Sequence, residues 1–219
     1  MQGQEIDLMK SFPKINNRLQ FRTTITLEDR KIASAFGYDY FDGDRRFGYG
    51  GYSYDPKYWT NVVSDFISHY DLSKNASILD IGCAKGYFLA DFALQLPSAI
   101  LSGVDISEYA INNCHSSMNH HLLVANAKSL PFENDSFDLV VSINTLHNLD
   151  YQECISALKE IQRVSRQHSF VMVDGWKTTK EKRDLESWVL TAKTILSADD
   201  WVGLFQESGY KGDYCFWAP

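Results

Sequence analysis

Apolar residues along this chain fall into short runs that alternate with longer stretches of helical periodicity. Four runs are typical of buried strands, because they are short and bounded by polar or turn-forming residues; they cover residues 78–81, 99–105, 137–143 and 169–173. Residues 152–166 have apolar side chains at Ile155, Leu158, Ile161 and Val164, the spacing of one helical face. Strands that alternate with helices predict a doubly wound parallel sheet.

Capping and breaking residues mark the ends of further helices. These helices are predicted at residues 87–95, 107–118, 180–196 and 198–208. Pro97 stops the first, Ser107 caps the start of the second, and Gly209 ends the last. Residues 213–217 are then predicted to be the last strand.

One segment combines a buried strand with a glycine turn that opens a helix. It runs from residue 78 to residue 89 with the sequence ILDIGCAKGYFL, and Asp80 lies near the end of its strand. Gly82, Ala84 and Gly86 keep the loop free of bulk, so that its backbone can approach a ligand and face the next helix N-terminus. This combination predicts a site for a nucleotide-type ligand.

The spacing of the small residues distinguishes between two candidate cofactors for this loop, a dinucleotide and SAM. A dinucleotide fingerprint needs G-x-G-x-x-G/A, and Tyr87, which occupies the third position of that frame, is too large for it. Read as acid-x-Gly-x-small-x-Gly, the segment resembles the first motif of class I S-adenosylmethionine (SAM) dependent methyltransferases, with Asp80, Gly82, Ala84 and Gly86 in frame. Alanine at position 84 departs from the glycine that this family usually has.

Two downstream features strengthen the resemblance. The second strand ends in Asp105, about twenty residues beyond the glycine loop, where a carboxylate can accept both ribose hydroxyls. Residues 124–149, VANAKSLPFENDSFDLVVSINTLHNL, resemble the third and fourth motifs of the same family. Where that family commonly has an aspartate facing the adenine amino group, this chain has Asn126, whose side-chain oxygen can accept the same hydrogen bond. The resemblance covers residues 77–174.

The resemblance implies a fold, a cofactor and a set of contacts. The fold is a single Rossmann-like, doubly wound α/β sheet, mostly parallel with an antiparallel C-terminal strand. The family usually has two strands after the fifth, and this chain has room for one. An N-terminal helical or irregular lid, residues 1–70, and a SAM-binding core, residues 71–219, form one compact domain. The cofactor is SAM, with S-adenosylhomocysteine as product, and the implied contacts are Asp80, Gly82, Cys83, Ala84, Gly86, Asp105, Ile106, Asn126, Ala127 and Asn144.

Methyl transfer needs few catalytic groups, because it is an in-line displacement in which the sulfonium charge disappears. His147 is the first candidate base, since it follows the fourth strand and imidazole titrates near neutrality. The alternative is structural, because LHNL resembles a common LHHL helix start in the family. Asn144 and Asp174 are the other polar candidates, and Trp176 is a candidate for lining the acceptor pocket. Asp174 alternatively caps the turn that follows it.

Residues 36–59, FGYDYFDGDRRFGYGGYSYDPKYW, are dense in tyrosine and glycine, and we call this stretch the Tyr/Gly segment. It resembles a segment found in a small bacterial subgroup of type 11-like methyltransferases. Long irregular loops are often functional, so we predict a lid over the acceptor; the alternative is an aromatic loop that only covers the sheet's edge. Its tyrosines and arginines can contact the SAM carboxylate and the acceptor. The predicted substrate-binding residues are Tyr38, Arg45, Arg46, Tyr49, Tyr52 and Trp176.

Composition and charge narrow the range of partners. The 219 residues carry a net charge of −7, which argues against broad binding to nucleic acid. The first ten residues do not resemble a signal peptide, and no apolar run reaches the length of a membrane span, so we expect a cytoplasmic protein that does not bind membranes. The four cysteines form no CxxC pair and are predicted to be reduced. A homodimer is compatible with an acidic aromatic surface, although no pattern requires one.

Cys114, His115, His120 and His121 lie close together in sequence and are candidates for a metal site. No acidic partner or second ligand pair has a recognisable spacing there. We therefore predict no metal.

The sequence as a whole predicts a SAM-dependent methyltransferase. Its acceptor is an oxygen or nitrogen of a polar small molecule, such as a sugar, a sugar nucleotide or another anionic metabolite. An alternative function is that of another SAM-using transferase, of the aminopropyl type, because such enzymes have the same cofactor loop. A non-catalytic SAM-binding protein is disfavoured by the polar rim of Asn144, His147 and Asp174, and an NAD-dependent oxidoreductase is disfavoured by Tyr87.

Overall fold

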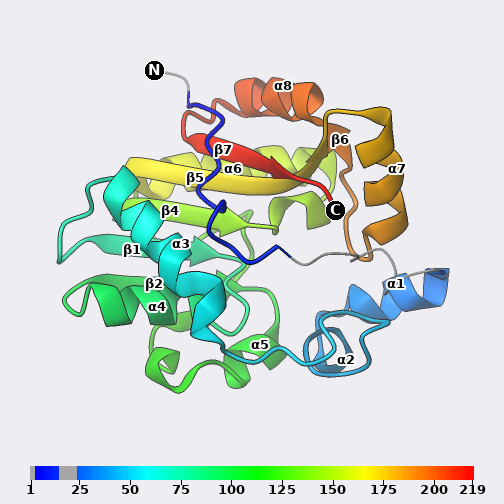
Figure 1. The fold of residues 1–219 in the computed structure, drawn as a ribbon. Helices are drawn as coiled ribbons and strands as arrows, with labels where there is room; N and C mark the ends of the chain where they lie inside the picture. Colours follow the sequence, from blue (N-terminus) through cyan, green and yellow to red (C-terminus); the bar gives the residue numbers. More distant parts are fainter. Residues whose placement is uncertain (1–2, 15–23) are drawn as a thin grey trace.

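A single seven-stranded sheet forms the centre of the computed structural model, which describes residues 3–14 and 24–219 (Figure 1). The strand order is β3-β2-β1-β4-β5-β6, and β7 also pairs with β5. The strands are β1 (Ser77–Ile81), β2 (Ile100–Asp105), β3 (Leu122–Val124), β4 (Phe137–Ile143), β5 (Ser165–Trp176), β6 (Leu196–Ser197) and β7 (Asp213–Trp217). This confirms the predicted α/β doubly wound sheet.

Helices cover both faces of this sheet (Figure 1). The α-helices are α1 (Leu27–Ala33), α2 (Tyr38–Phe41), α3 (Pro56–His69), α4 (Tyr87–Gln95), α5 (Glu108–Asn112), α6 (Tyr151–Val164), α7 (Thr179–Trp188) and α8 (Ala198–Ser208). Two short 3₁₀ helices, η2 (Ser116–Met118) and η3 (Leu146–Asn148), follow α5 and β4. Both α4 and α8 have the predicted bounds, and Gly209 ends α8 in the left-handed conformation.

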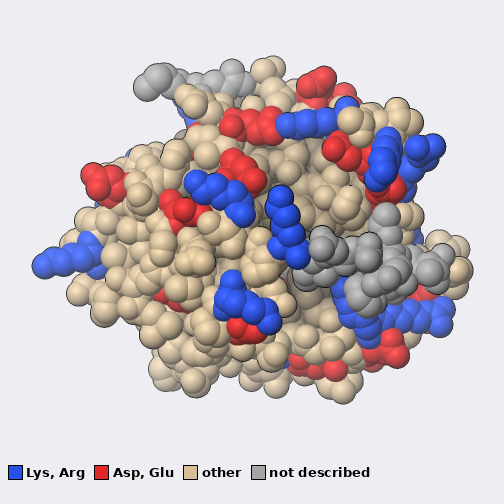
Figure 2. Space-filling model, in the orientation of Figure 1, with Lys and Arg blue, Asp and Glu red and all other residues tan. Residues whose placement is uncertain are grey.

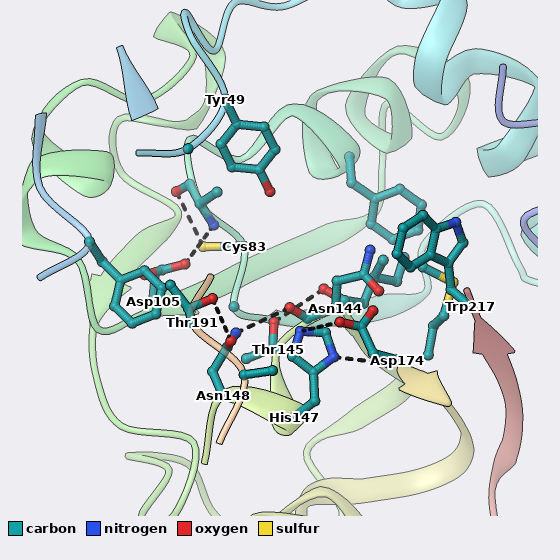
Figure 3. A pocket seen from close by; sticks show the side chains of 18 of the residues that line it. Tyr49, Cys83, Asp105, Asn144, Thr145, His147, Asn148, Asp174, Thr191 and Trp217 are labelled. Atoms are coloured by element: carbon teal, nitrogen blue, oxygen red, sulfur yellow. Dashed lines mark hydrogen bonds and ion pairs between the residues drawn. The ribbon is translucent and has the colours of Figure 1, made fainter. Parts of the chain in front are cut away.

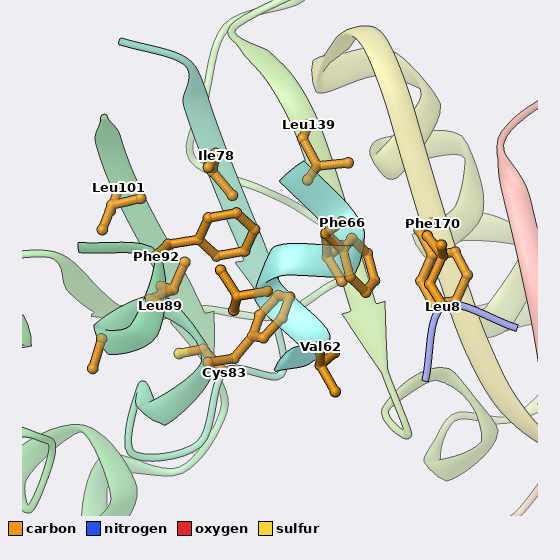
Figure 4. Close-up of a cluster of buried hydrophobic side chains, with 14 of the residues drawn as sticks. Leu8, Val62, Phe66, Ile78, Cys83, Leu89, Phe92, Leu101, Leu139 and Phe170 are labelled. Atoms are coloured by element: carbon orange, nitrogen blue, oxygen red, sulfur yellow. The ribbon is translucent and has the colours of Figure 1, made fainter. Parts of the chain in front are cut away.

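Alternation along each strand decides which face a side chain packs against. Ile78 and Leu139 lie in one cluster with the apolar side chains of α3 and α4, such as Phe66 (Figure 4). Their neighbours Leu79 and Val140 lie in the second cluster, with α6 and α8. The central strands are therefore buried on both faces, as a parallel sheet between two helical layers requires.

Two predicted helices are shorter in the structure. The helix expected at residues 107–118 begins at the predicted Ser107 cap, but α5 ends at Asn112, because the chain turns and the His115 N–H donates to the Lys85 carbonyl. The helix expected at residues 180–196 ends at Trp188. Beyond it, the N–H groups of Lys193 and Thr194 donate hydrogen bonds to the carbonyl of His147 instead of continuing the helix. Both corrections come from backbone bonds to distant residues.

The direction of the last strand differs from the prediction. We expected an antiparallel strand, but β7 pairs in parallel with residues 170–174 of β5. The two-residue β6, which was not predicted, also pairs in parallel with β5, and α8 carries the chain from β6 to β7. A helical crossover between two strands returns the chain in the same direction, so β7 runs in the same direction as β6. The edge of β7 is met by the N-terminal residues, where the Ile6 N–H donates to the Tyr214 carbonyl.

The N-terminal part of the described chain contributes to the core. Leu8, Val62, Val63 and Phe66 are buried in the same cluster as strand residues. The packing of α3 against the sheet thus places residues 56–69 among the elements of the core layer. The boundary at residue 70 between a lid and a core stays a prediction.

Candidate functional site

A cavity of about 1380 Å³ opens at the carboxyl ends of β1, β2, β4 and β5, bounded by the residues that the structure describes (Figure 3). Ligands of doubly wound sheets bind at this edge. Its volume exceeds the range of about 300–1,000 Å³ that one small ligand usually occupies. The cavity therefore has room for a cofactor and an acceptor together.

The glycine loop forms one wall of this cavity. Gly82 has φ +79°, and a Cβ placed there would lie 1.9 Å from Thr145 Oγ1, so only glycine fits. Ala84 also has a positive φ of 49°, in the position where the resembled family usually has glycine. The N–H groups of Gly82 and Cys83 donate to the Val104 carbonyl, which fixes the loop to β2.

Asp105 joins the end of β2 to the glycine loop. Its carboxylate accepts hydrogen bonds from the Ala84 N–H and the Ser107 N–H, each at 2.8 Å. Burial raises the pKa of Asp105, and these backbone bonds counteract the shift. The carboxylate lines the cavity, so its remaining lone pairs are available to ribose hydroxyls.

Asp80 lies at the end of β1, 5% exposed, and lines the same cavity. Burial, together with the negative charge of Asp105, raises its pKa to about 8. Within residues 3–14 and 24–219, no hydrogen-bond donor reaches its carboxyl oxygens. An uncompensated buried carboxylate beside a second one favours a cationic ligand. The ammonium and sulfonium groups of SAM meet that requirement, so the residues fit this cofactor.

His147 and Asp174 form a second polar group on the cavity wall (Figure 3). The Asp174 N–H donates to His147 Nδ1 at 3.0 Å, which places the imidazole proton on Nε2. Nε2 lies 3.6 Å from Asp174 Oδ2. Burial lowers the pKa of His147 and raises that of Asp174. Because both ring nitrogens face Asp174, His147 has no lone pair directed at an acceptor.

The other predicted contacts reach the cavity from neighbouring loops. Asn144, which follows β4, has a left-handed backbone with φ +54°, a conformation that is uncommon outside glycine. The side-chain oxygen of Asn126 accepts the Lys128 N–H. Further predicted residues in the lining are Cys83, Ile106, Ala127, Arg45, Tyr49 and Tyr52. The sequence thus predicted part of the polar lining, and the roles assigned to these residues stay predictions.

Four predicted residues do not line the cavity. Gly86 lies behind it as the left-handed residue before α4, and a Cβ there would meet Leu122 at 2.9 Å. Tyr38 is 58% exposed, and its ring packs against Tyr109. Arg46 is paired with the buried Asp29 of α1 through Nε, at 2.8 Å. Trp176 lies beyond the cavity wall beneath Lys182. The contacts of Tyr38, Arg46 and Trp176 hold their side chains away from the cavity, whereas Gly86 is excluded by the position of its backbone.

Lys85 was not among the residues predicted from the sequence to have a role. A long cationic side chain in a loop of small residues is nevertheless a signal that could have identified it. Its side chain is buried, and Nζ donates to Asp42 Oδ2 at 2.6 Å. Asp42 also accepts from the hydroxyl of Tyr109, at 2.6 Å. The Tyr/Gly segment is therefore bonded to the glycine loop and to α5.

Among residues 3–14 and 24–219, no group of three or more His, Cys, Asp or Glu side chains is placed to hold a metal ion. Likewise, none of the described helices has both the length and the apolar character needed to cross a membrane.

The chain is similar in sequence to known methyltransferases. Residues 78–168 match the family described as "Methyltransferase domain". A protein of Arabidopsis thaliana named tRNA (carboxymethyluridine(34)-5-O)-methyltransferase is 35% identical over 149 residues, which are 66% of this chain and 34% of that protein. An uncharacterized protein of Haemophilus influenzae is 28% identical over 157 residues. This match covers 66% of this chain and 62% of the Haemophilus protein. The chain thus spans about a third of the first relative and less than two thirds of the second.

Among solved structures, the YcgJ protein of Bacillus subtilis is similar with a TM-score of 0.55 and 20% identity. The match covers 67% of this chain and 66% of that one. At this identity the likeness shows the fold alone.

Proposed function

We propose that the chain transfers a methyl group from SAM to an oxygen or nitrogen of a polar small molecule. The proposal is supported by the match of residues 78–168 to a methyltransferase domain and by the similarity of the fold. SAM supplies the methyl group on a sulfonium that loses its charge on transfer. The protein's task is then to hold the two reactants in line and to accept a proton where the acceptor carries one.

The observation that carries this proposal is the joint placement of Asp80 and Asp105 beside the glycine loop. Asp105 is held by the Ala84 N–H at 2.8 Å and offers its free lone pairs to a ribose. Asp80 offers an uncompensated carboxylate to an ammonium group. In the ligand-free protein, burial and the charge of Asp105 keep Asp80 protonated up to about pH 8. A cationic cofactor beside both groups would stabilise the ionised form of Asp80, so its binding would be coupled to loss of that proton.

We assign proton acceptance to Asp174 and orientation to His147. The raised pKa of Asp174, caused by burial, makes its carboxylate a stronger base than an exposed one. His147 directs its Nε2–H toward Asp174 Oδ2 while the Asp174 N–H fixes its Nδ1. Asn144 follows β4 and lines the cavity, which supports assigning to its amide a contact with cofactor or acceptor.

The acceptor side of the cavity combines aromatic faces with a cation. Tyr49 and Tyr52 have ring centroids 4.4 Å apart and line the cavity with Arg45. Burial lowers the pKa of Arg45, and its guanidinium faces the ring of Trp188 at 5.7 Å. A guanidinium beside aromatic rings suits a polar acceptor with an anionic group, such as a sugar nucleotide or a small acid.

The deciding experiment is calorimetric titration of the ligand-free protein with SAM and S-adenosylhomocysteine, with NAD as the control. We expect micromolar binding of the first two alone. A protein that binds neither of them contradicts the proposal. Small acids, sugars and sugar nucleotides are then screened with methyl-labelled SAM, and release of methylthioadenosine in place of S-adenosylhomocysteine would identify aminopropyl transfer.

A tRNA acceptor is the second candidate, because the Arabidopsis relative is named for that substrate. The charge distribution supports it less. The chain carries a net charge of −7, and on the face shown in Figure 2 the Lys and Arg side chains lie among Asp and Glu side chains. Binding to an RNA backbone needs a continuous basic surface. Transfer of label from SAM to bulk tRNA, at low salt, would favour this candidate over a small molecule.

A further inference from the structure

The glycine loop contains a buried ammonium group that the cofactor site does not use. Lys85 is 6% exposed, and its Nζ donates to Asp42 Oδ2 at 2.6 Å and to the Tyr52 carbonyl at 3.0 Å. Both partners belong to the Tyr/Gly segment. A buried charge is stable only when it is paired and hydrogen-bonded, so these contacts fix the two segments to each other.

Asp42 is the point where this attachment converges. Its Oδ2 also accepts the Tyr109 hydroxyl at 2.6 Å, and its Oδ1 accepts the Tyr52 N–H at 3.0 Å. Burial raises the pKa of Asp42, but the bonds from Lys85 and Tyr109 bring it below its ordinary value. The carboxylate is therefore ionised near neutrality and holds Lys85, α5 and Tyr52 at once.

Tyr52 transmits this arrangement to the cavity. Its carbonyl accepts the Tyr87 hydroxyl at 2.9 Å, and the rings of Tyr52 and Tyr87 stack with centroids 5.0 Å apart. Tyr52 and Tyr87 line the cavity, whereas Lys85, Asp42 and Tyr109 do not. The ion pair thus lies behind the wall that a cofactor would touch.

We propose that Lys85 is a positioning residue for the cofactor: acting through Asp42, it holds Tyr52 and the Tyr/Gly segment as a wall of the cofactor cavity. This inference rests on the proposed function. Because the ion pair itself does not line the cavity, its loss changes ligand affinity only by releasing that wall. Cofactor binding and closure of the segment are then coupled, since each stabilises the arrangement that the other needs.

The test is a double-mutant cycle on S-adenosylhomocysteine affinity, measured by calorimetry. Lys85→Met and Asp42→Asn should each weaken binding by about tenfold or more, and the double variant should bind no worse than the weaker single variant. Hydrogen exchange of residues 36–55 should speed up in each single variant, and S-adenosylhomocysteine should restore less protection than in the wild type. A merely structural role would lower thermal stability and leave affinity and ligand-induced protection unchanged.

Two further variants guard against misfolding and against unspecific charge effects. Tyr109→Phe removes one donor to Asp42 but keeps the ion pair, and it should weaken binding by about threefold. Lys180→Met removes the exposed pair with Asp184 on α7 and should change neither readout. Unchanged affinity and exchange in folded Lys85→Met, or in Tyr109→Phe if Lys85→Met does not fold, overturn the inference, as does a fully additive cycle.

The failure of the proposed function gives a different result. If the wild type does not bind S-adenosylhomocysteine, the methyltransferase proposal fails. Hydrogen exchange of residues 36–55 in the ligand-free variants then still reports whether Lys85 holds the Tyr/Gly segment. Slow exchange in Lys85→Met would overturn the attachment itself.

Discussion

The carboxylate of Asp105 accepts the backbone N–H of Ala84 at 2.8 Å, which joins the end of β2 to the glycine loop of β1. One side chain therefore both shapes the loop and faces the cavity. The loop bears some backbone strain at this point, since Ala84 has a φ of +49°. Strain of this kind persists where surrounding bonds determine the conformation.

Replacing Asp105 should impair cofactor binding more than folding. In Asp105→Asn one oxygen still accepts a backbone N–H, but the charge-assisted bonds to ribose are lost, which should cost about 1.5 to 3 kcal/mol of SAM affinity. Calorimetric titration measures the loss. Asp138→Asn is the matched control, because Asp138 also accepts a backbone N–H, from Ser77, and does not line the cavity. Equal SAM affinity in folded Asp105→Asn and in wild type would refute the assignment.

Gly82→Ala should destabilise the fold. The added Cβ meets Thr145 Oγ1 at 1.9 Å, and φ is +79°, so both packing and backbone oppose the change. We expect a loss of more than about 2 kcal/mol in the free energy of unfolding, measured with urea. Gly203→Ala is the control, because Gly203 lies inside α8 with open space around its Cβ position, and this change should stabilise by up to about 1 kcal/mol. Similar effects of the two substitutions would contradict the geometry.

Asp80 should make the ligand-free protein less stable as pH rises. Its pKa is about 8 when folded and lies near its ordinary value when unfolded, so the folded state holds the proton over that interval. The stability contributed by protonated Asp80 is full below pH 4 and is lost as pH rises through 8, by up to about 1.4 kcal/mol per pH unit. Asp80→Asn should remove this decline in urea unfolding between pH 5 and pH 8. A decline of the same slope in the variant would mean that Asp80 ionises normally.

His147 should remain neutral below the pH at which an ordinary histidine titrates. Burial lowers its pKa, and the Asp174 N–H occupies Nδ1. Nitrogen-15 NMR should show a single Nε2–H tautomer between pH 6 and pH 8. Asp174→Asn preserves the backbone donor and should preserve that tautomer. An Nδ1–H signal, or titration above pH 6.5, would restore His147 as a candidate base.

The positions of β1, β2, β4, β5 and β7, and part of the cavity lining, could be predicted from the sequence. A buried strand followed by small residues and an acid leaves few conformations for the backbone, and the bounds of β4, β7, α4 and α8 follow from local patterns. Gly82 and Asp105 were found for the same reason, since the chemistry of a nucleotide-type site constrains neighbours in sequence.

The sequence by itself determined the alternating α/β order, the glycine loop and the carboxylates at the strand ends, because short-range periodicity and spacing encode them. Only the tertiary structure decided the direction of β7, the early end of α7 and the attachment of Lys85 to Asp42. Those features depend on bonds between residues far apart in the chain, such as Lys85 and Asp42, which no local pattern specifies. Contacts between distant residues also explain why the two neighbouring arginines differ. Arg45 lines the cavity, whereas Arg46 forms an ion pair with the buried Asp29.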